Sequence, residues 1–174
     1  MIRHRDGAGL RYALALLAQI RSQWPRGLPA LEVDDHPDMA RRAFLLDVSR
    51  DRVPTRETLE RLVGLLALAR YNELQLYTEH TFAYRDHEEV WRDASPLTPE
   101  DVRWLDAHCT AAGIELVPNQ NCFGHMQRWL RHPTYRWRAE CPDGAEVIPG
   151  LVAPPSVLAP TSANAAFVLD LLAE

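Results

Sequence analysis

Apolar residues recur at helical spacing near the start of the chain and gather into short continuous runs further along. Residues 9–24 place Leu10, Leu14 and Leu17 on one face of an amphipathic helix. Prolines and a glycine then interrupt the pattern, and the apolar residues that follow predict a short strand at 31–33. The first part of the chain is therefore expected to form one helix, a linker and one strand.

From residue 43 onward the pattern alternates between strands and helices. Continuous apolar runs are typical of strands covered on both faces, and the segments between them carry apolar stripes of helical period. Thr55 and Thr98 are good N-cap residues for these helices. The expected elements are strands over 43–48, 72–78 and 114–118, helices over 56–70, 98–112, 123–130 and 162–174, and a proline-rich loop over 143–160.

This alternation predicts an α/β fold with parallel strands joined by right-handed crossovers. Two architectures use such units, the (β/α)8 TIM barrel and the doubly wound sheet. A complete barrel takes about 250 residues, and the chain has 174. The barrel interpretation therefore predicts a partial barrel of the first three to four βα units, and a small doubly wound α/β sheet is the alternative. Sequential strand order would favour the barrel, whereas strand 114–118 lying between the other two would favour the doubly wound sheet.

Charge and cysteine content narrow the classes of protein. The net charge is −5 and the arginines form no basic stripe, so no nucleic-acid partner is expected. The three cysteines, Cys109, Cys122 and Cys141, show no C-x-x-C spacing, which favours reduced thiols over disulfides or a zinc site. No secretory leader or membrane-length apolar stretch is visible, so we expect a cytoplasmic protein without a membrane partner.

Polar residues follow each of the three expected strands, where α/β folds collect their functional groups. These residues are Asp47, Ser49 and Arg50, then Thr78, Glu79 and His80, then Asn119, Asn121 and His125. Such a set suits a polyhydroxylated or anionic small ligand, and Glu79 could orient His125 by a hydrogen bond. Each residue also has a structural interpretation: Arg50 could pair with a nearby acid, His125 could cap the next helix, and His80 could lie in solvent. No metal-ligand spacing, G-x-G-x-x-G or Walker loop is present, so neither metal nor cofactor is expected.

Three motifs carry a resemblance to a known family: "LLDVSR", "YNELQLYTEHTF" and "VPNQNCFGHM". They resemble the N-terminal part of the catalytic barrel of glycoside hydrolase family 20, the exo-acting β-N-acetylhexosaminidases, and are most similar to its hexosaminidase-D-like branch. The resemblance implies two regions. Residues 1–38 would be the last helix and strand of a preceding α/β domain plus a linker, and residues 39–174 the N-terminal portion of a TIM-barrel catalytic domain.

The resemblance also implies roles for individual residues. Arg50 matches the arginine that binds hydroxyls of the terminal sugar, and Glu79 matches the acid after the second strand. His125 matches the histidine that, with this acid, supports the catalytic carboxylate. His80 and Asn121 complete the implied substrate-binding set, and His80 stands where many members have a second acid. The implied partner is an amino-sugar glycoside that ends in N-acetylhexosamine.

The family's catalytic pair is missing from the sequence. Its members use the 2-acetamido oxygen of the substrate as nucleophile, with an adjacent Asp-Glu pair that orients the acetamide and acts as general acid and base. The chain contains no Asp-Glu dipeptide, so we expect it to be inactive alone, and the alternative is an inactive remnant or carbohydrate-binding fragment. An unclosed barrel is also expected to be marginally stable or to self-associate, because inner-face residues such as Leu74 and Leu76 would lose their partners.

Overall fold

The computed structural model describes residues 1–174, and its elements alternate as an α/β chain. The helices are α1 (Gly7–Gln23), α2 (Arg56–Leu68), α3 (Glu88–Trp91), α4 (Pro99–Ala112), α5 (Gln127–Leu130), α6 (Pro133–Arg136) and α7 (Ser162–Leu172). The strands are β1 (Ala43–Asp47), β2 (Glu73–Thr78), β3 (Glu115–Gln120), β4 (Ala145–Ile148) and β5 (Leu151–Ala153). The predicted α/β class is confirmed.

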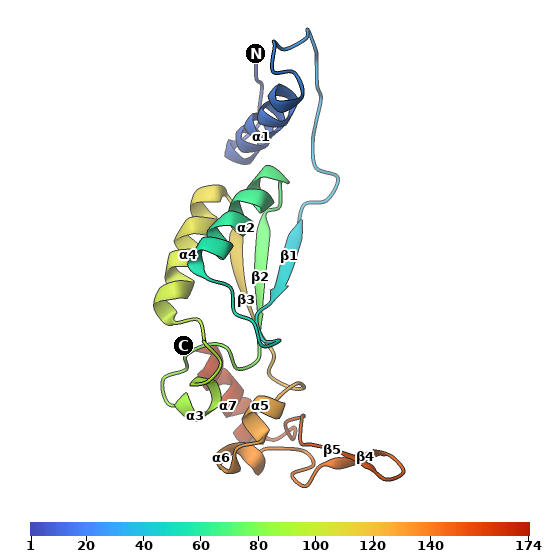
Figure 1. Cartoon of the computed structure of the whole chain (residues 1–174), viewed down its shortest axis with the longest axis vertical. Helices are drawn as coiled ribbons and strands as arrows, with labels where there is room; N and C mark the ends of the chain where they lie inside the picture. The colour runs from blue at the N-terminus through green and yellow to red at the C-terminus, as the bar shows by residue number, and fades with distance from the viewer. The chain divides into compact units, whose positions relative to one another are not determined.

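The central sheet has three strands in the order β1-β2-β3. Their arrows point the same way, so the strands are parallel (Figure 1). Backbone pairing continues to the carboxyl ends, where the Val48 amide donates to the Tyr77 carbonyl at 3.1 Å and the Asn121 amide to the Thr78 carbonyl at 2.8 Å. The predicted sequential order is confirmed, and β3 does not lie between the other two strands, as the doubly wound alternative required.

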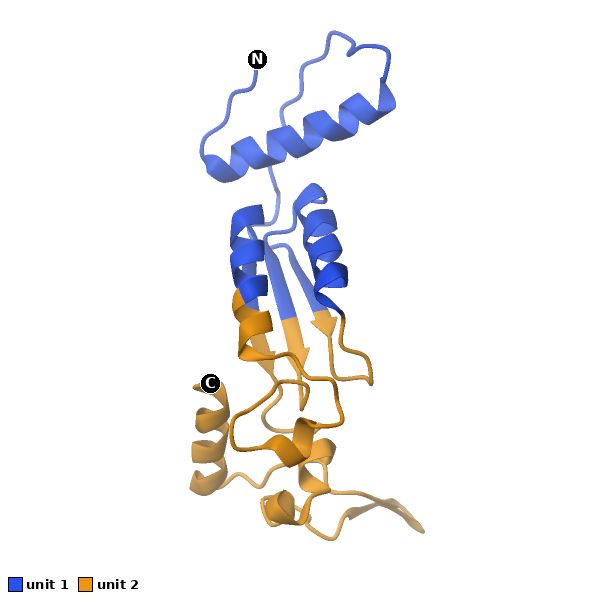
Figure 2. Cartoon of the chain, turned by 60° about the vertical axis from the view of Figure 1, so that its left-hand side comes forward, with its two compact units in different colours: residues 1–45, 55–75, 104–117 blue, residues 46–54, 76–103, 118–174 orange.

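The chain divides into two compact units (Figure 2). Unit 1 consists of residues 1–45, 55–75 and 104–117, and unit 2 consists of residues 46–54, 76–103 and 118–174. The strand ends and the loops that follow them all belong to unit 2. The predicted division at residue 38 is a different boundary and stays a prediction.

In unit 1, α2 and the part of α4 from residue 104 onward lie against one face of the strands (Figure 2). α2 begins after Thr55, whose hydroxyl accepts from the Thr58 amide at 3.3 Å, as an N-cap should. The expectation that Leu74 and Leu76 form an exposed inner face is wrong, because they are 0% and 5% exposed. The helices cover the more apolar face of β2, and alternation along the strand puts Gln75 on the other face.

Helix α1 confirms the predicted N-terminal helix, and Asp6 caps it by accepting from the Gly9 amide at 2.7 Å. None of its residues is fully buried. The predicted strand at 31–33 is wrong: Leu31 and Val33 are 48% and 50% exposed, and this segment pairs with no strand. Apolar residues without a hydrogen-bonding neighbour do not hold a strand conformation.

Unit 2 has a core of aromatic side chains around Trp129, which is fully buried. Its ring lies 5.5 Å from Tyr84, 5.4 Å from Tyr135 and 5.5 Å from Phe167, centroid to centroid. These are edge-to-face or tilted pairs of the kind that aromatic rings prefer. The cluster holds α5, α6 and α7 and the loop after β2 together beneath the strand ends.

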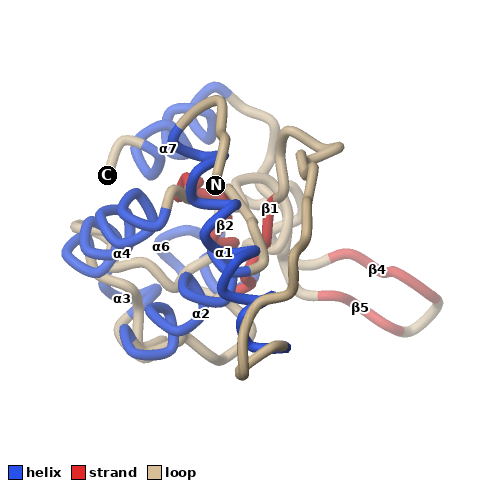
Figure 3. The backbone as a smooth tube through the Cα atoms, turned by 90° about the horizontal axis from the view of Figure 1, so that it is seen from above, coloured by secondary structure: helices blue, strands red, loops and turns tan.

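The expected proline-rich loop contains a β-hairpin instead. β4 and β5 pair antiparallel, with Glu146 opposite Val152. Gly150 makes the turn possible at φ 81, a conformation that glycine adopts without strain. Figure 3 shows the hairpin extending away from α6 and α7. The strands have only four and three residues, and the prolines near them made the sequence look like a loop.

The predicted helix over 123–130 is shorter than expected. α5 begins at Gln127, because His125 has a left-handed backbone with φ 53 that no α-helix accommodates. The short helices α3 and α6 were not predicted.

Candidate functional site

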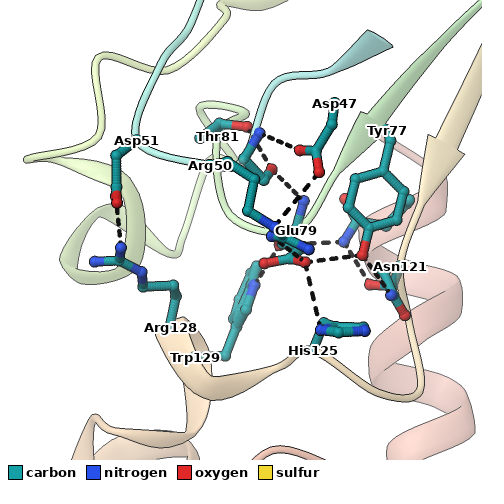
Figure 4. A network of polar contacts seen from close by, with 12 residues as sticks. Asp47, Arg50, Asp51, Tyr77, Glu79, Thr81, Asn121, His125, Arg128 and Trp129 are labelled. Atoms are coloured by element: carbon teal, nitrogen blue, oxygen red, sulfur yellow. Dashed lines mark hydrogen bonds and ion pairs between the residues drawn. The ribbon is translucent and has the colours of Figure 1, made fainter. Parts of the chain in front are cut away.

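The polar residues at the ends of β1, β2 and β3 converge within unit 2 (Figure 4). Arg50 follows β1, Glu79 follows β2, and Asn121 and His125 follow β3. The carboxyl ends of parallel strands meet at one edge of the sheet, which explains why residues so far apart in sequence meet here.

The Glu79 carboxylate is the centre of this network. Its side chain is only 5% exposed, and its Oε1 accepts from Arg50 Nη1 at 2.6 Å and from the Tyr77 hydroxyl at 2.8 Å. Arg50 Nε also lies 3.5 Å from the Asp47 carboxylate. The hydrogen bond that Arg50 donates to Glu79 raises the pKa of Arg50 above its usual value. Both donors use Oε1, so they leave the lone pairs of Oε2 unused.

The backbone of Glu79 is held as firmly as its side chain. Its amide donates to Ser49 Oγ at 2.8 Å, and its carbonyl accepts from Trp129 Nε1 at 2.6 Å and Gln120 Nε2 at 3.2 Å. Ser49 in turn lies 3.0 Å from the Thr81 hydroxyl in a buried pair. The aromatic core and the neighbouring strands therefore fix the carboxylate before any ligand arrives.

Tyr77 links two of the predicted residues, although the sequence reasoning missed it. Asn121 Nδ2 donates to the Tyr77 oxygen at 2.7 Å, and the Tyr77 hydroxyl donates to Glu79. Burial raises the pKa of Tyr77, so the phenol stays protonated and remains a donor at neutral pH. A signal was present, because Tyr77 stands two residues before Glu79 and so shares its side of the strand.

His125 lies beside Glu79 but makes no direct hydrogen bond to it. Its Nδ1 is 3.9 Å from Glu79 Oε1, and its side chain is 60% exposed. The convergence of the two residues was predicted, whereas a direct bond is absent. The alternative in which His125 caps the next helix is wrong, since α5 has Met126 at its N-cap and no side-chain cap. A histidine with φ 53 is an unusual backbone conformation of the kind that collects at functional sites.

His80 lies outside this network. It is 4% exposed, so the alternative of a solvated loop histidine is wrong. Burial lowers its pKa, and the positive charge of Arg128 lowers it further. The ring lines a separate cavity of about 520 Å³, together with residues such as Asp51 and Arg131.

No group of three or more histidine, cysteine or carboxylate side chains is arranged to hold a metal ion. All three cysteines are unpaired, and burial raises the pKa of Cys109 to about 11, which keeps that thiol protonated. None of the helices has the length and apolarity needed to cross a bilayer. The polar network around Glu79 is therefore the best-formed chemical feature of the strand ends. Its arginine, carboxylate and amide are the groups that hydrogen-bond sugar hydroxyls.

Comparison with curated sequences connects this α/β fold to glycosidases. A β-hexosaminidase of Akkermansia muciniphila is 28% identical over 140 residues, which cover 68% of this chain and 28% of that protein. A β-N-acetylhexosaminidase of Cellulomonas fimi is 37% identical over 86 residues, 48% of this chain and 17% of that protein. The chain thus spans less than a third of the length of either relative. No family model matches the sequence.

Solved structures give the same result for the fold. The crystal structure of a β-N-acetylhexosaminidase matches 95% of this chain and 39% of its own with a TM-score of 0.76 at 22% identity. The family 20 β-N-acetylhexosaminidase of Streptomyces coelicolor matches 97% of this chain and 38% of its own, with a TM-score of 0.71 at 22% identity. The resemblance to glycoside hydrolase family 20 is therefore confirmed: the chain is similar to part of the larger β-N-acetylhexosaminidases.

Proposed function

We propose that this chain is the sugar-positioning part of an exo-β-N-acetylhexosaminidase, folded as the first βα units of a TIM barrel. The observation that carries the proposal is the network in which Arg50, Tyr77 and Asn121 fix the buried Glu79 carboxylate at the strand ends. The sequential parallel strands agree with a barrel. The two relatives with similar sequences are a β-hexosaminidase and a β-N-acetylhexosaminidase.

Each residue of the network has a defined task in this proposal. Arg50 is 54% exposed at its side chain, so it can pair with Glu79 and still offer N–H groups to sugar hydroxyls. Glu79 accepts from a hydroxyl through Oε2. Asn121, fixed by Tyr77, lies at the same rim. The exposed His125 ring is free to support a catalytic carboxylate, which is the role that the family resemblance implies.

We further propose that the chain binds the terminal sugar without cleaving it. In the family, the acetamide-orienting Asp and the acid-base Glu are adjacent, and no Asp-Glu dipeptide occurs in the chain. Groups that bind the ground state lower the barrier little unless an acid and an acetamide-orienting group act on the transition state. An inactive carbohydrate-binding fragment is thus the expected behaviour of the 174-residue chain.

The test is a titration of the chain with N-acetylglucosamine by NMR, beside an assay with an aryl N-acetyl-β-glucosaminide. We expect saturable binding that Arg50→Ala weakens by about 10- to 150-fold, since a charge-assisted hydrogen bond contributes about 1.5–3 kcal/mol. Arg136→Ala is the matched control, because Arg136 is exposed and lies outside the network. The proposal would be contradicted if Arg50→Ala left the affinity for N-acetylglucosamine unchanged, or if the chain cleaved the aryl substrate and His125→Ala abolished that turnover.

We also propose that the chain self-associates through its sheet edges. β1 and β3 each pair with β2 on one side only, and Leu45 on β1 is 50% exposed. Unpaired strand edges with apolar side chains favour pairing with another chain. Light scattering over a range of concentrations should therefore show a mass that rises with concentration. A constant monomer mass would remove this part of the proposal.

A further inference from the structure

Next to the Glu79 network lies a cavity that the proposed sugar site does not use. It has a volume of about 520 Å³, and all its lining residues belong to unit 2. They come from the loops after the three strands: Asp51 and Arg52 after β1, His80 and Asp93 after β2, and Arg128 and Arg131 from α5 and its C-cap. None of the residues that contact the Glu79 carboxylate lines it.

The feature that marks this cavity as a site is the His80 ring. The residue is 4% exposed, and its Nδ1 is buried without any hydrogen-bond partner in the chain. Buried polar atoms of native proteins nearly always have a partner, and leaving one unpaired is costly. His80 is also one of the residues that line the cavity, so a buried polar ring forms part of its wall.

The charged residues around His80 indicate which kind of ligand the cavity would bind. Arg128 and Arg131 both lower the pKa of His80, after burial as the main cause, so both arginines act on the ring. Arg128 is partly neutralised by Asp51, with Nη2 and Oδ1 at 2.5 Å. The Nε of Arg131 donates to the neighbouring His132 ring at 3.2 Å, and Arg131 pairs with no acid.

Arg52 also lines the cavity and forms no ion pair in the chain. Two exposed arginines therefore line the cavity without an acid partner, beside a histidine whose lowered pKa keeps the imidazole neutral at pH 7. The planar N–H donors of arginine fit the paired oxygens of phosphate and carboxylate groups, so a ligand with such a group would bind here better than a neutral ligand.

We propose that this cavity binds a small oxyanion, of the phosphate type, through Arg52, Arg131 and His80. The site is distinct from the Glu79 network and goes beyond the proposed hexosaminidase function. The cavity is larger than a phosphate ion, so it also has room for the organic part of a phosphate ester. The acids Asp93 and Glu89 lie at the same cavity and oppose the anion, which limits its affinity and provides a sharp test.

The test measures inorganic phosphate binding to the whole chain by calorimetry, with circular dichroism as the check on folding and N-acetylglucosamine binding measured beside it. Arg131→Ala should weaken phosphate binding by about tenfold, and His80→Leu should weaken it too, since each removes a donor. Asp93→Asn should strengthen it by removing a repelling charge. The control Arg136→Ala, at an exposed arginine outside the cavity, should leave phosphate binding unchanged.

A hexose 6-phosphate compared with inorganic phosphate identifies the source of the oxyanion. Tighter binding of the ester indicates a sugar phosphate, and equal binding indicates the free ion. The inference is wrong if the chain binds no phosphate, if Arg131→Ala leaves binding unchanged, or if Asp93→Asn weakens it, since the last result marks a cationic ligand. Because the sugar site shares no ligand residue with this cavity, failure here leaves N-acetylglucosamine binding intact, and the two proposals fail separately.

Discussion

Helix α1 in unit 1 and the aromatic cluster around Trp129 in unit 2 are both apolar, but only the cluster is buried. α1 has apolar residues at helical spacing along its length, and yet Leu14 is 50% and Leu17 38% exposed. Trp129 is 0% exposed, although it lies in a helix of only four residues. Periodicity therefore predicts that a helix forms, but whether its apolar face is buried depends on what packs against it.

The two regions also differ in how their polar groups are used. In the cluster, Trp129 Nε1 donates to the Glu79 carbonyl and His87 Nδ1 lies 2.7 Å from the Tyr135 hydroxyl, so aromatic packing and hydrogen bonding coincide. In unit 1, Tyr12 of α1 accepts from Arg42 Nη2 at 2.6 Å, and no residue of α1 is fully buried. The cluster is thus expected to govern both the stability of unit 2 and the geometry of its site.

Trp129→Ala tests this difference with the largest expected effect. Removal of a fully buried indole should lower the free energy of unfolding by about 3–5 kcal/mol, because it leaves a cavity in the core. Urea unfolding measures the loss. Trp129→Phe keeps most of the apolar contact but removes the bond to Glu79, so its loss should be smaller. A loss below about 1 kcal/mol for Trp129→Ala would mean that the cluster is not the stabilising core.

Acidification should weaken the same region, because three histidines of unit 2 have lowered pKa values. Burial is the main cause for His80, His87 and His132 alike. The unfolded chain therefore binds more protons than the folded chain once the pH falls below about 6.5, the usual histidine pKa. Stability should be greatest above that pH and fall below it. Urea midpoints at a series of pH values measure the slope, and His87→Gln should flatten it; an unchanged slope would exclude His87 as a contributor.

Tyr135→Phe and Tyr12→Phe form a matched pair across the two regions. In the cluster, loss of the Tyr135 hydroxyl leaves the half-buried His87 ring unpaired and should cost about 1 kcal/mol. In α1, loss of the Tyr12 hydroxyl leaves an arginine that water can solvate, so the cost should be a few tenths of a kcal/mol. Unfolding free energies of the two variants decide the comparison, and equal costs would show that the two environments are alike.

The sequence predicted the elements that depend on local signals. Thr55 and Thr98 mark helix starts by their own chemistry, and Thr98 Oγ1 accepts from the Asp101 amide at 3.1 Å. The convergence of Arg50 with Glu79 was also predictable, since parallel strands bring their carboxyl ends together. These inferences need only the residues within one element or the general geometry of the fold.

Other features depend on contacts between distant segments and were not predictable from one sequence. The cluster joins Tyr84, Trp129 and Phe167, which no periodic pattern connects. The burial of His80 depends on the loops around it and on α5, so its sequence position gave no indication of it. The prediction of a strand at 31–33 was wrong because it relied on local apolar residues alone. The segment has no neighbouring strand with which to pair.

The smallest effect is expected for Leu14→Ala, which sharpens the comparison because Leu171→Ala makes the same change in α7. Leu171 is 4% exposed in the cluster of unit 2, so its truncation should cost about 2–5 kcal/mol. Leu14 is 50% exposed, and alanine has the higher helix propensity, so the change in unfolding free energy should stay within about 0.5 kcal/mol. Urea unfolding of both variants gives the two values side by side. A loss at Leu14 as large as that at Leu171 would show that the exposed face of α1 is covered in solution. If a second copy of the chain covers it, the same variant would also lower the mass seen by light scattering.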